Sequence, residues 1–245
     1  MQGERARALG RWLAAAAGLA VALAAYGLGS RLSGAASRPA PLIMRAPVTE
    51  RVLALTFDDG PTAQWTPSIL RVLRQNHVSA TFFVIGRQAE RYPALIAQEV
   101  RDGMEVGSHG YNHRVLRGQS AQVVAAEVDR AGEAIMAAGA PAPTLYRMPA
   151  GIYDQTALSV LGGLHYLVVG WSIDPRDWRH RYTASAMAQL VESQAEPGAI
   201  IIFHDGPNGG TATVQAVEQL IPALKRAGYR FLTVSAMLRL VKGRL

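Results

Sequence analysis

The stretch Val52-Leu53-Ala54-Leu55-Thr56-Phe57-Asp58-Asp59-Gly60-Pro61 carries the pattern from which the fold can be predicted. Its first six residues form a short apolar run without helical spacing, which is typical of a strand buried in a sheet. Two carboxylates follow directly, and Gly60-Pro61 then indicates a turn. In barrel-type α/β folds, polar residues at the carboxyl ends of the strands converge on one mouth. This stretch therefore predicts both a buried strand and a functional rim.

Strand-like and helix-like segments alternate along the rest of the chain. Seven apolar runs suit buried strands, near residues 52–57, 80–85, 104–108, 144–147, 165–171, 199–204 and 230–234. Helix-like apolar stripes lie between them, beginning at Thr66-Pro67, which we expect to form a cap and first turn, and at 121–138, 183–194 and 211–227. This alternation predicts βαβ units with a mostly parallel sheet, either closed as a barrel or open. The chain lacks a G-x-G-x-x-G turn and a phosphate-binding loop, so the barrel is favoured.

The amino terminus has the pattern of a membrane-targeting segment. Arg5, Arg7 and Arg11 precede a run from 12 to 30 that contains no charged residue. Ala22-Leu23-Ala24 could be a signal-peptidase site, whereas the run is nearly long enough to span a bilayer. Residues 1–30 are therefore predicted to be a signal peptide or an uncleaved signal anchor, with a slight preference for the anchor.

The rest of the domain plan follows from this segment. Residues 31–41, rich in Ser, Gly, Ala and Pro, predict a linker, and 42–245 is long enough for one folded domain. The arginines before the apolar run place the amino terminus in the cytoplasm by the positive-inside rule. The domain is then expected on the extracytoplasmic side of the cell membrane, or in the periplasm or medium if the leader is cleaved.

Composition argues against two classes of site. The formal net charge is +7, but five arginines and Glu4 within residues 1–38 account for four of these charges. The remaining excess is small, and no basic run is interleaved with aromatic residues, so we expect no nucleic-acid partner. The chain contains no Cys, which excludes disulfides, thiol catalysis and Cys-based metal sites.

Polar residues that follow the predicted strands suit metal-dependent hydrolysis. His109 and His113 are four residues apart, which lets one turn of chain direct both imidazoles at a single ion. With Asp59 they make two nitrogen ligands and one oxygen ligand, a set that leaves a position open for water in catalytic zinc sites. Asp58 would stay free to accept a proton. Taken alone, each pattern also fits a plain alternative, a solvated Asp-Gly turn or two loop histidines without a ligand.

A further histidine follows another apolar run. Residues 200–203 are continuously apolar, and they deliver His204 to the predicted rim ahead of the Gly-rich segment 206–210. A core histidine satisfied by the backbone is the alternative. The position of His204 where a strand meets a loop favours a functional role.

Five motifs in order along the chain resemble those of the polysaccharide deacetylases, carbohydrate esterase family 4 with its NodB-homology domain. The motifs are Thr-Phe-Asp-Asp-Gly at 56–60, Ser-His-x-x-x-His at 108–113, Arg-x-Pro-x-Gly at 147–151, Asp-x-x-Asp-Trp at 174–178 and Ile-x-His-Asp at 202–205. The tail from 211 to 234 resembles the last helix and strand of the family. The resemblance implies a distorted (β/α)7, NodB-like barrel that removes acetyl groups from N-acetylated, or less often O-acetylated, sugars.

The resemblance also implies a role for each matched residue around a metal. Asp59, His109 and His113 would hold a divalent ion, usually Zn²⁺, with Co²⁺ or another divalent ion as an alternative. Asp58 would be the general base, oriented by Arg147. A metal with an open position lowers the pKa of its water and polarises the acetyl carbonyl, while the base removes a proton during attack.

The remaining matched residues would complete the reaction on the other side of the scissile bond. His204 would be the general acid, held and tuned by Asp177. Trp178 and Ile202 would wall the acetyl pocket, and the backbone N–H of Ala150 would help to stabilise the oxyanion.

Three positions depart from the family pattern. The family often has Tyr where this chain has Ala150, often Pro where it has Arg114, and usually Leu where it has Ile202. None of these changes removes a reacting group. They bear instead on the choice of substrate, because an aromatic ring at position 150 would reshape the sugar-binding face.

The sequence therefore predicts a metal-dependent hydrolase that removes N-acetyl groups from amino-sugar polymers or oligomers, chitin-like or peptidoglycan. Its partners would be the acetylated polysaccharide and, through residues 1–30, the membrane. Two alternatives stay open: the same machinery acting on an acetylxylan ester or a formamide, and a catalytically silent carbohydrate-binding protein. A serine hydrolase is disfavoured because the chain has no G-x-S-x-G elbow.

Overall fold

The computed structural model describes residues 38–242 of the 245-residue chain. The predicted signal peptide or anchor at 1–30, and most of the predicted linker, lie outside these described residues and stay predictions. Between residues 38 and 242, no helix combines the length and apolar character needed to cross a membrane.

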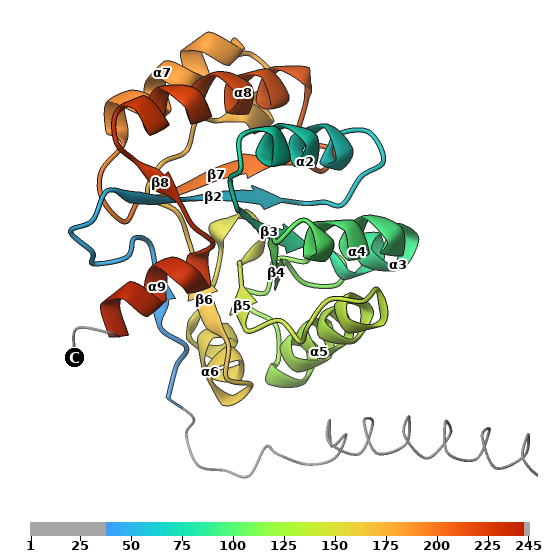
Figure 1. Ribbon diagram of the computed structural model, residues 1–245. Helices are drawn as coiled ribbons and strands as arrows, with labels where there is room; N and C mark the ends of the chain where they lie inside the picture. The colour runs from blue at the N-terminus through green and yellow to red at the C-terminus, as the bar shows by residue number, and fades with distance from the viewer. Residues whose placement is uncertain (1–37, 243–245) are drawn as a thin grey trace, which may run out of the picture. The chain divides into compact units, whose positions relative to one another are not determined.

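A curled parallel sheet forms the centre of the described domain (Figure 1). Its strands are β1 (Leu42–Ile43), β2 (Val52–Asp58), β3 (Thr81–Val84), β4 (Glu105–Ser108), β5 (Leu145–Tyr146), β6 (Leu167–Val169), β7 (Ile200–His204) and β8 (Arg230–Phe231). The strand order is β1-β6-β5-β4-β3-β2-β7, and β8 pairs with β2 outside this path. Two isolated bridges, Arg45 with Ala199 and Ile173 with Ile201, connect the two ends of the sheet. The predicted distorted barrel is confirmed.

β2 is the central strand, as its apolar run predicts. All seven of its residues are buried, and it pairs in parallel with β3, β7 and β8. A strand covered on both faces tolerates no polar alternation, which explains the continuous run from Val52 to Phe57. The register sets Asp58 opposite His204, so two predicted site residues lie on neighbouring strand ends.

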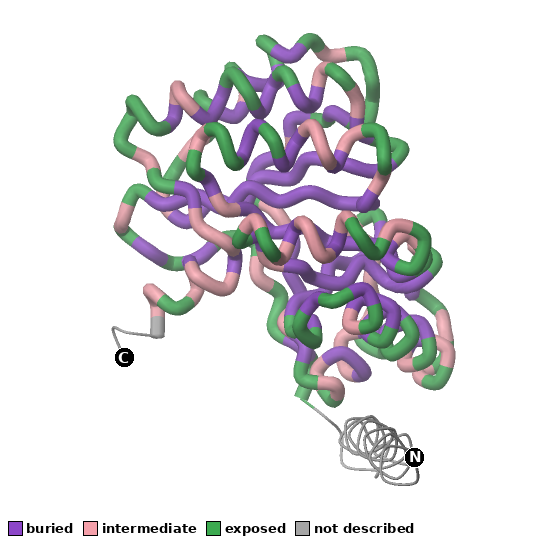
Figure 2. The backbone as a smooth tube through the Cα atoms, turned by 45° about the vertical axis from the view of Figure 1, so that its right-hand side comes forward, coloured by how far each residue is buried: buried purple, intermediate pink, exposed green. Residues whose placement is uncertain are grey.

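Helices pack around the outside of the sheet. They are α2 (Thr66–Gln75), α3 (Gly86–Arg91), α4 (Pro93–Arg101), α5 (Ala121–Ala137), α6 (Gln155–Gly163), α7 (Ala184–Gln194), α8 (Thr211–Arg226) and α9 (Val234–Lys242), with single 3-10 turns η1 (Pro149–Gly151) and η2 (Asp177–Arg179). Figure 2 shows the pattern that results, with the strands buried and the outward helix faces exposed. Apolar stripes on the helices therefore seal the sheet from water.

Several sequence-based expectations need correction. Thr66 is the first residue of α2 rather than its cap, because its hydroxyl accepts from the Thr62 N–H and donates to Asp205 at 2.5 Å. Val234 begins α9 and does not end the last strand. Four helices, α3, α4, α6 and α9, were not predicted, and neither was β1, whose two residues are too few for an apolar run to be recognised.

Gly198 lies at the seam of the barrel, where the segment after β1 meets the segment before β7. Its backbone approaches Ala46 too closely to allow a side chain. Gly198 has φ +79°, and a Cβ there would lie 1.9 Å from the Ala46 carbonyl oxygen. We predict that Gly198→Ala lowers the free energy of unfolding by about 3 kcal/mol, because a left-handed residue and a backbone clash are combined. The melting temperature should fall by roughly 6–12 °C in a thermal scan.

Gly103→Ala is the matched control for this change. Gly103 has φ +77°, but no atom lies within 4 Å of the site of its Cβ. Gly103→Ala should lower the free energy of unfolding by only about 1–2 kcal/mol, the cost of the left-handed backbone conformation alone. Equal losses in the two variants would contradict the proposed clash.

Candidate active site

The sheet brings the predicted site residues to one mouth. Asp58 ends β2, His109 follows β4, Arg147 follows β5 and His204 ends β7. The carboxyl ends of parallel strands share one edge of the sheet, so these side chains lie at the same end of the barrel.

Asp59, His109 and His113 form the one cluster with metal-ligand character among the described residues. One ligand atom from each lies within 4.8 Å of the others. The Nε2 atoms of His109 and His113 are 3.5 and 3.3 Å from Asp59 Oδ1. Four tetrahedral ligands about 2.0–2.1 Å from a zinc ion are separated from one another by about 3.3 Å.

The state of Asp59 also fits a cation. Its Oδ1 atom is buried and has no hydrogen-bond partner among the described residues. Burial alone would raise its pKa, but the imidazoles of His109, His204 and His113 outweigh burial and lower it. The site therefore holds a buried, ionised oxygen that faces two imidazole nitrogens, which is the donor set of a divalent metal site.

The backbone around these ligands adopts uncommon conformations. Asp59 and His113 have φ of 73° and 59°, in the left-handed region. Such strain concentrates at functional sites because the surrounding structure must enforce it. His109 Nδ1 lies 2.7 Å from the Arg147 carbonyl oxygen, which directs the other ring nitrogen toward Asp59.

Two supporting residues were missed by sequence analysis. Asn208, from the Gly-rich loop after β7, donates through Nδ2 to Asp59 Oδ2 at 2.8 Å, which leaves Oδ1 free. Glu127 of α5 accepts from the backbone N–H and from Nδ2 of Asn112, at 2.5 and 3.3 Å, immediately before His113. A charged residue on the buried face of a helix is the one sequence pattern that could have indicated Glu127.

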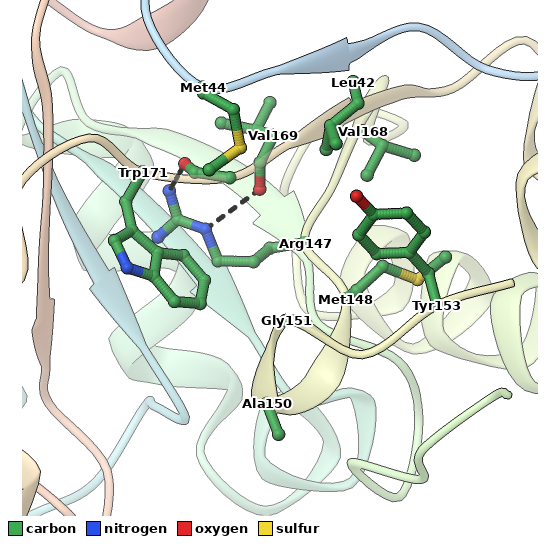
Figure 3. A pocket seen from close by; sticks show the side chains of 11 residues that line it. Leu42, Met44, Arg147, Met148, Ala150, Gly151, Tyr153, Val168, Val169 and Trp171 are labelled. Atoms are coloured by element: carbon green, nitrogen blue, oxygen red, sulfur yellow. Dashed lines mark hydrogen bonds between the residues drawn. The ribbon is translucent and has the colours of Figure 1, made fainter.

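Arg147 holds Asp58 inside the barrel. Its side chain is fully buried, and Nη1 donates to Asp58 Oδ1 and to Thr56 Oγ1, each at 2.7 Å. Nε and Nη2 donate to the carbonyl oxygens of Val169 and Gly170 (Figure 3). Burial lowers the pKa of Arg147, and the charge and hydrogen bond of Asp58 oppose that shift. The other carboxylate oxygen, Oδ2, lies 3.7 Å from His109 Nε2, beside the ligand cluster.

His204 is paired with Asp177 of η2. Its Nδ1 lies 2.8 Å from Asp177 Oδ1, and its backbone N–H donates to Oδ2 at 2.9 Å. Thr213 also donates to Oδ2. Burial acts to lower the pKa of His204, but the hydrogen bond and charge of Asp177, with smaller contributions from Asp58 and Asp59, raise it to about 9. The pairing with Asp177 therefore favours the protonated form of His204.

A cavity of about 210 Å³ opens beside Arg147 (Figure 3). Ala150, in η1 with φ 56°, lines it, and its other walls include Leu42, Met44, Tyr153 and Trp171.

Neither Trp178 nor Ile202 lines this cavity. Trp178 is 41% exposed in η2, and Ile202 is buried in β7 opposite Thr56. Their predicted role as walls of the acetyl pocket stays a prediction.

The sequence also matches known proteins over most of the described domain. Residues 45–169 match the family model described as polysaccharide deacetylase. The chain belongs to the polysaccharide deacetylase family. This confirms the predicted resemblance and the predicted enzyme class.

Three relatives illustrate the similarity of this deacetylase. It is 36% identical over 195 residues to a peptidoglycan-N-acetylglucosamine deacetylase of Bacillus cereus, covering 79% of this chain and 91% of that one. It is 39% identical over 191 residues to a chitooligosaccharide deacetylase of Bradyrhizobium, covering 73% and 87%. Its fold matches a solved peptidoglycan N-acetylglucosamine deacetylase with a TM-score of 0.78 at 31% identity, covering 81% and 92%.

The buried pair of Arg147 and Asp58 generates a stability prediction for this deacetylase. Arg147→Met should lower the free energy of unfolding by about 3–5 kcal/mol, because the Asp58 carboxylate is left buried without its partner. Adding Asp58→Asn should recover about 1–3 kcal/mol, since the unpaired charge is removed. Urea denaturation of the wild type, both single variants and the double variant closes the cycle. Strictly additive losses would show that the two groups do not depend on each other.

Proposed function

We propose that this deacetylase hydrolyses the N-acetyl groups of amino-sugar polymers or oligomers, of the peptidoglycan or chitin-like class, with a divalent metal held by Asp59, His109 and His113. The observation that carries the proposal is the unpartnered oxygen of Asp59 facing two imidazole nitrogens, with Asp58 and His204 paired in register at the adjacent strand ends. Relatives named for peptidoglycan and for chitooligosaccharides support the substrate class.

The donor set also favours a particular ion. Two imidazoles and one carboxylate form the protein ligand set of several catalytic zinc sites, and this cluster contains no thiolate and no second carboxylate. We therefore propose Zn²⁺, with Co²⁺ or another divalent ion as a substitute. When bound, the ion would supply Lewis-acid activation of the acetyl carbonyl and of the attacking water.

The residues of the chain would then divide the proton transfers between them. Asp58, held by Arg147, accepts a proton from the water that attacks the acetyl carbon. The backbone N–H of Ala150 donates to the oxygen on which negative charge develops. His204 gives its proton to the departing amine nitrogen as the C–N bond breaks, so acetate and a free amine are released.

We also propose a location for the reaction. Residues 1–30 would deliver the domain to the extracytoplasmic side of the cell membrane, either as an anchor or as a cleaved leader. Cell-wall glycans and extracellular amino-sugar polymers are found on that side, which agrees with the proposed substrates.

Metal removal and a base substitution test the mechanism together. A chelator should abolish acetate release from acetylated glucosamine oligomers and from peptidoglycan, and Zn²⁺ should restore it. Asp58→Asn should lower kcat by about 10²–10⁴-fold while elemental analysis still finds bound metal, because Asp58 acts as a base. Asp129→Asn, a change of the same charge on the exposed face of α5, is the control.

The outcomes separate the alternatives. Turnover that resists the chelator would refute the metal mechanism. Polymer binding without metal or acetate release would instead indicate a silent binding protein. Release of acetate from acetylxylan alone, or of formate from a formamide, would assign the same machinery to another substrate.

The pairing of His204 with Asp177 predicts a pH effect. A general acid works only while protonated, so kcat/KM should hold up to a pH of about 9 and then fall, because the pKa of His204 is raised to about 9. In Asp177→Asn this support is lost and the pKa falls, so the alkaline decline should begin at lower pH. Asp174→Asn is the control, because among residues 38–242 Asp174 accepts a hydrogen bond from the Arg176 backbone N–H and makes none with His204. An unchanged alkaline limb in Asp177→Asn would argue against His204 as the acid.

A further inference from the structure

The loop that carries Asp177 is rich in exposed positive charge. Arg176, Arg179 and Arg181 all lie on the surface within six residues, and they alternate with the site residues Asp177 and Trp178. Because Asp177 is bonded to His204, these arginines belong to the loop that holds the proposed proton donor. We call Arg176, Arg179 and Arg181 the rim arginines.

The rim arginines have no carboxylate partner among residues 38–242. Other arginines of the same domain do, such as Arg45 with Glu196 and Arg74 with Asp102. The two acids nearest in sequence are committed elsewhere. Asp177 serves His204, and Asp174 accepts a hydrogen bond from the Arg176 backbone N–H, not from its guanidinium.

Aromatic side chains hold the rim arginines in place instead. The Arg179 guanidinium lies over the Trp178 ring at 4.6 Å from its centroid. Arg181 lies over the Tyr182 ring at 5.3 Å and donates to the Tyr182 hydroxyl at 3.3 Å. Hydrogen bonds from Arg181 and Arg176 both lower the pKa of Tyr182, so these two cations converge on one phenol. Stacking orients a guanidinium without neutralising its charge.

The loop backbone fixes the position of this charge. Arg176 and His180 are in the left-handed region, with φ of 61° and 51°, on the two sides of η2. The 3-10 turn between them is fastened to β7 through Asp177. Trp178, with 41% of its surface exposed, adds a flat apolar face to the same rim. An apolar face beside oriented cations suits a sugar ring that carries an anionic substituent.

We propose that the rim arginines bind the carboxylates of an acidic glycan, so that the preferred substrate is a carboxylate-bearing amino-sugar polymer such as peptidoglycan and not a neutral chitin-like one. This inference rests on the proposed function and names its substrate class. A neutral polymer offers no charged partner for these guanidiniums, whereas a carboxylate can accept two parallel hydrogen bonds from one of them. Charge at the rim also steers an acidic polymer toward the mouth.

Two substrates of equal length test the proposal on the full chain. One is a neutral N-acetylglucosamine oligomer, and the other is an N-acetylated oligomer in which alternate sugars carry a carboxylate. Acetate release is measured at about 0.1 M and about 1 M salt, where the Debye length falls from about 10 Å to about 3 Å. The ratio of kcat/KM for the acidic over the neutral substrate should fall about 10-fold at the higher salt concentration.

Charge removal should have the same effect without added salt. The variant Arg176→Gln/Arg179→Gln/Arg181→Gln should lower that ratio about 10-fold at low salt, mainly through KM, and should make it insensitive to salt. The matched control is Arg101→Gln/Arg226→Gln/Arg230→Gln. It removes the same charge from exposed positions at the other end of the barrel, and the ratio should stay at the wild-type value.

Binding of the two oligomers, with each acetyl group replaced by a methylsulfonyl group that this chemistry cannot hydrolyse, is measured in parallel, since binding does not depend on turnover. Selective, salt-sensitive binding of the acidic oligomer without acetate release would support the rim site and refute the proposed function alone. Equal, salt-insensitive turnover of both substrates would refute only the rim site. Binding to anionic phospholipid vesicles that is lost in the triple variant, with an unchanged substrate ratio, would assign the arginines to a membrane surface and overturn the proposal.

Discussion

The buried ion pair between Arg147 and Asp58 connects the fold to its site. Arg147 starts at the end of β5 and reaches β2 through Thr56 and Asp58, and it also bonds the carbonyl oxygens of Val169 and Gly170 at the end of β6. A guanidinium that is buried away from water needs hydrogen-bond partners for its N–H groups, because removing an ion from water costs about 5 kcal/mol or more. The carboxylate of Asp58 therefore contributes to the stability of the barrel interior as well as to the site.

A second buried ion pair lies at the same mouth, with the charges exchanged. There a buried carboxylate, Asp177, supports an imidazolium, His204. The parallel register of β2 and β7 places Asp58 opposite His204 on the neighbouring strand. Asp58 is paired with Arg147, whereas His204 is paired with Asp177. The carboxylate of Asp58 is thus paired with a cation and the imidazole of His204 with an anion, and such unlike surroundings suit the unlike roles proposed for them.

Much of this arrangement could be predicted from the sequence because it depends on strands. The buried runs of β2 and β7 show no alternation, and polar residues follow them directly, so the strand ends and the residues at the mouth could be recognised together. The residues that support these site residues could not be predicted from the sequence. Asn208 lies 149 positions from Asp59, and its contact depends on how the Gly-rich loop folds back over β2. Thr66 was predicted to be a helix cap because threonine is common at that position. Its hydroxyl instead donates a hydrogen bond to Asp205, which is distant in sequence.

The seam of the barrel has a consequence for the cavity beside Arg147. β1 contributes only two paired residues, and the two ends of the sheet meet through single bridges and not through a continuous ladder. Leu42 and Met44, which line the cavity, belong to this weakly paired segment. Local opening with few hydrogen bonds to break has a low free energy compared with global unfolding. The wall formed by Leu42 and Met44 can therefore move while β2, β4 and β7, from whose carboxyl ends Asp58, His109 and His204 extend, keep their places.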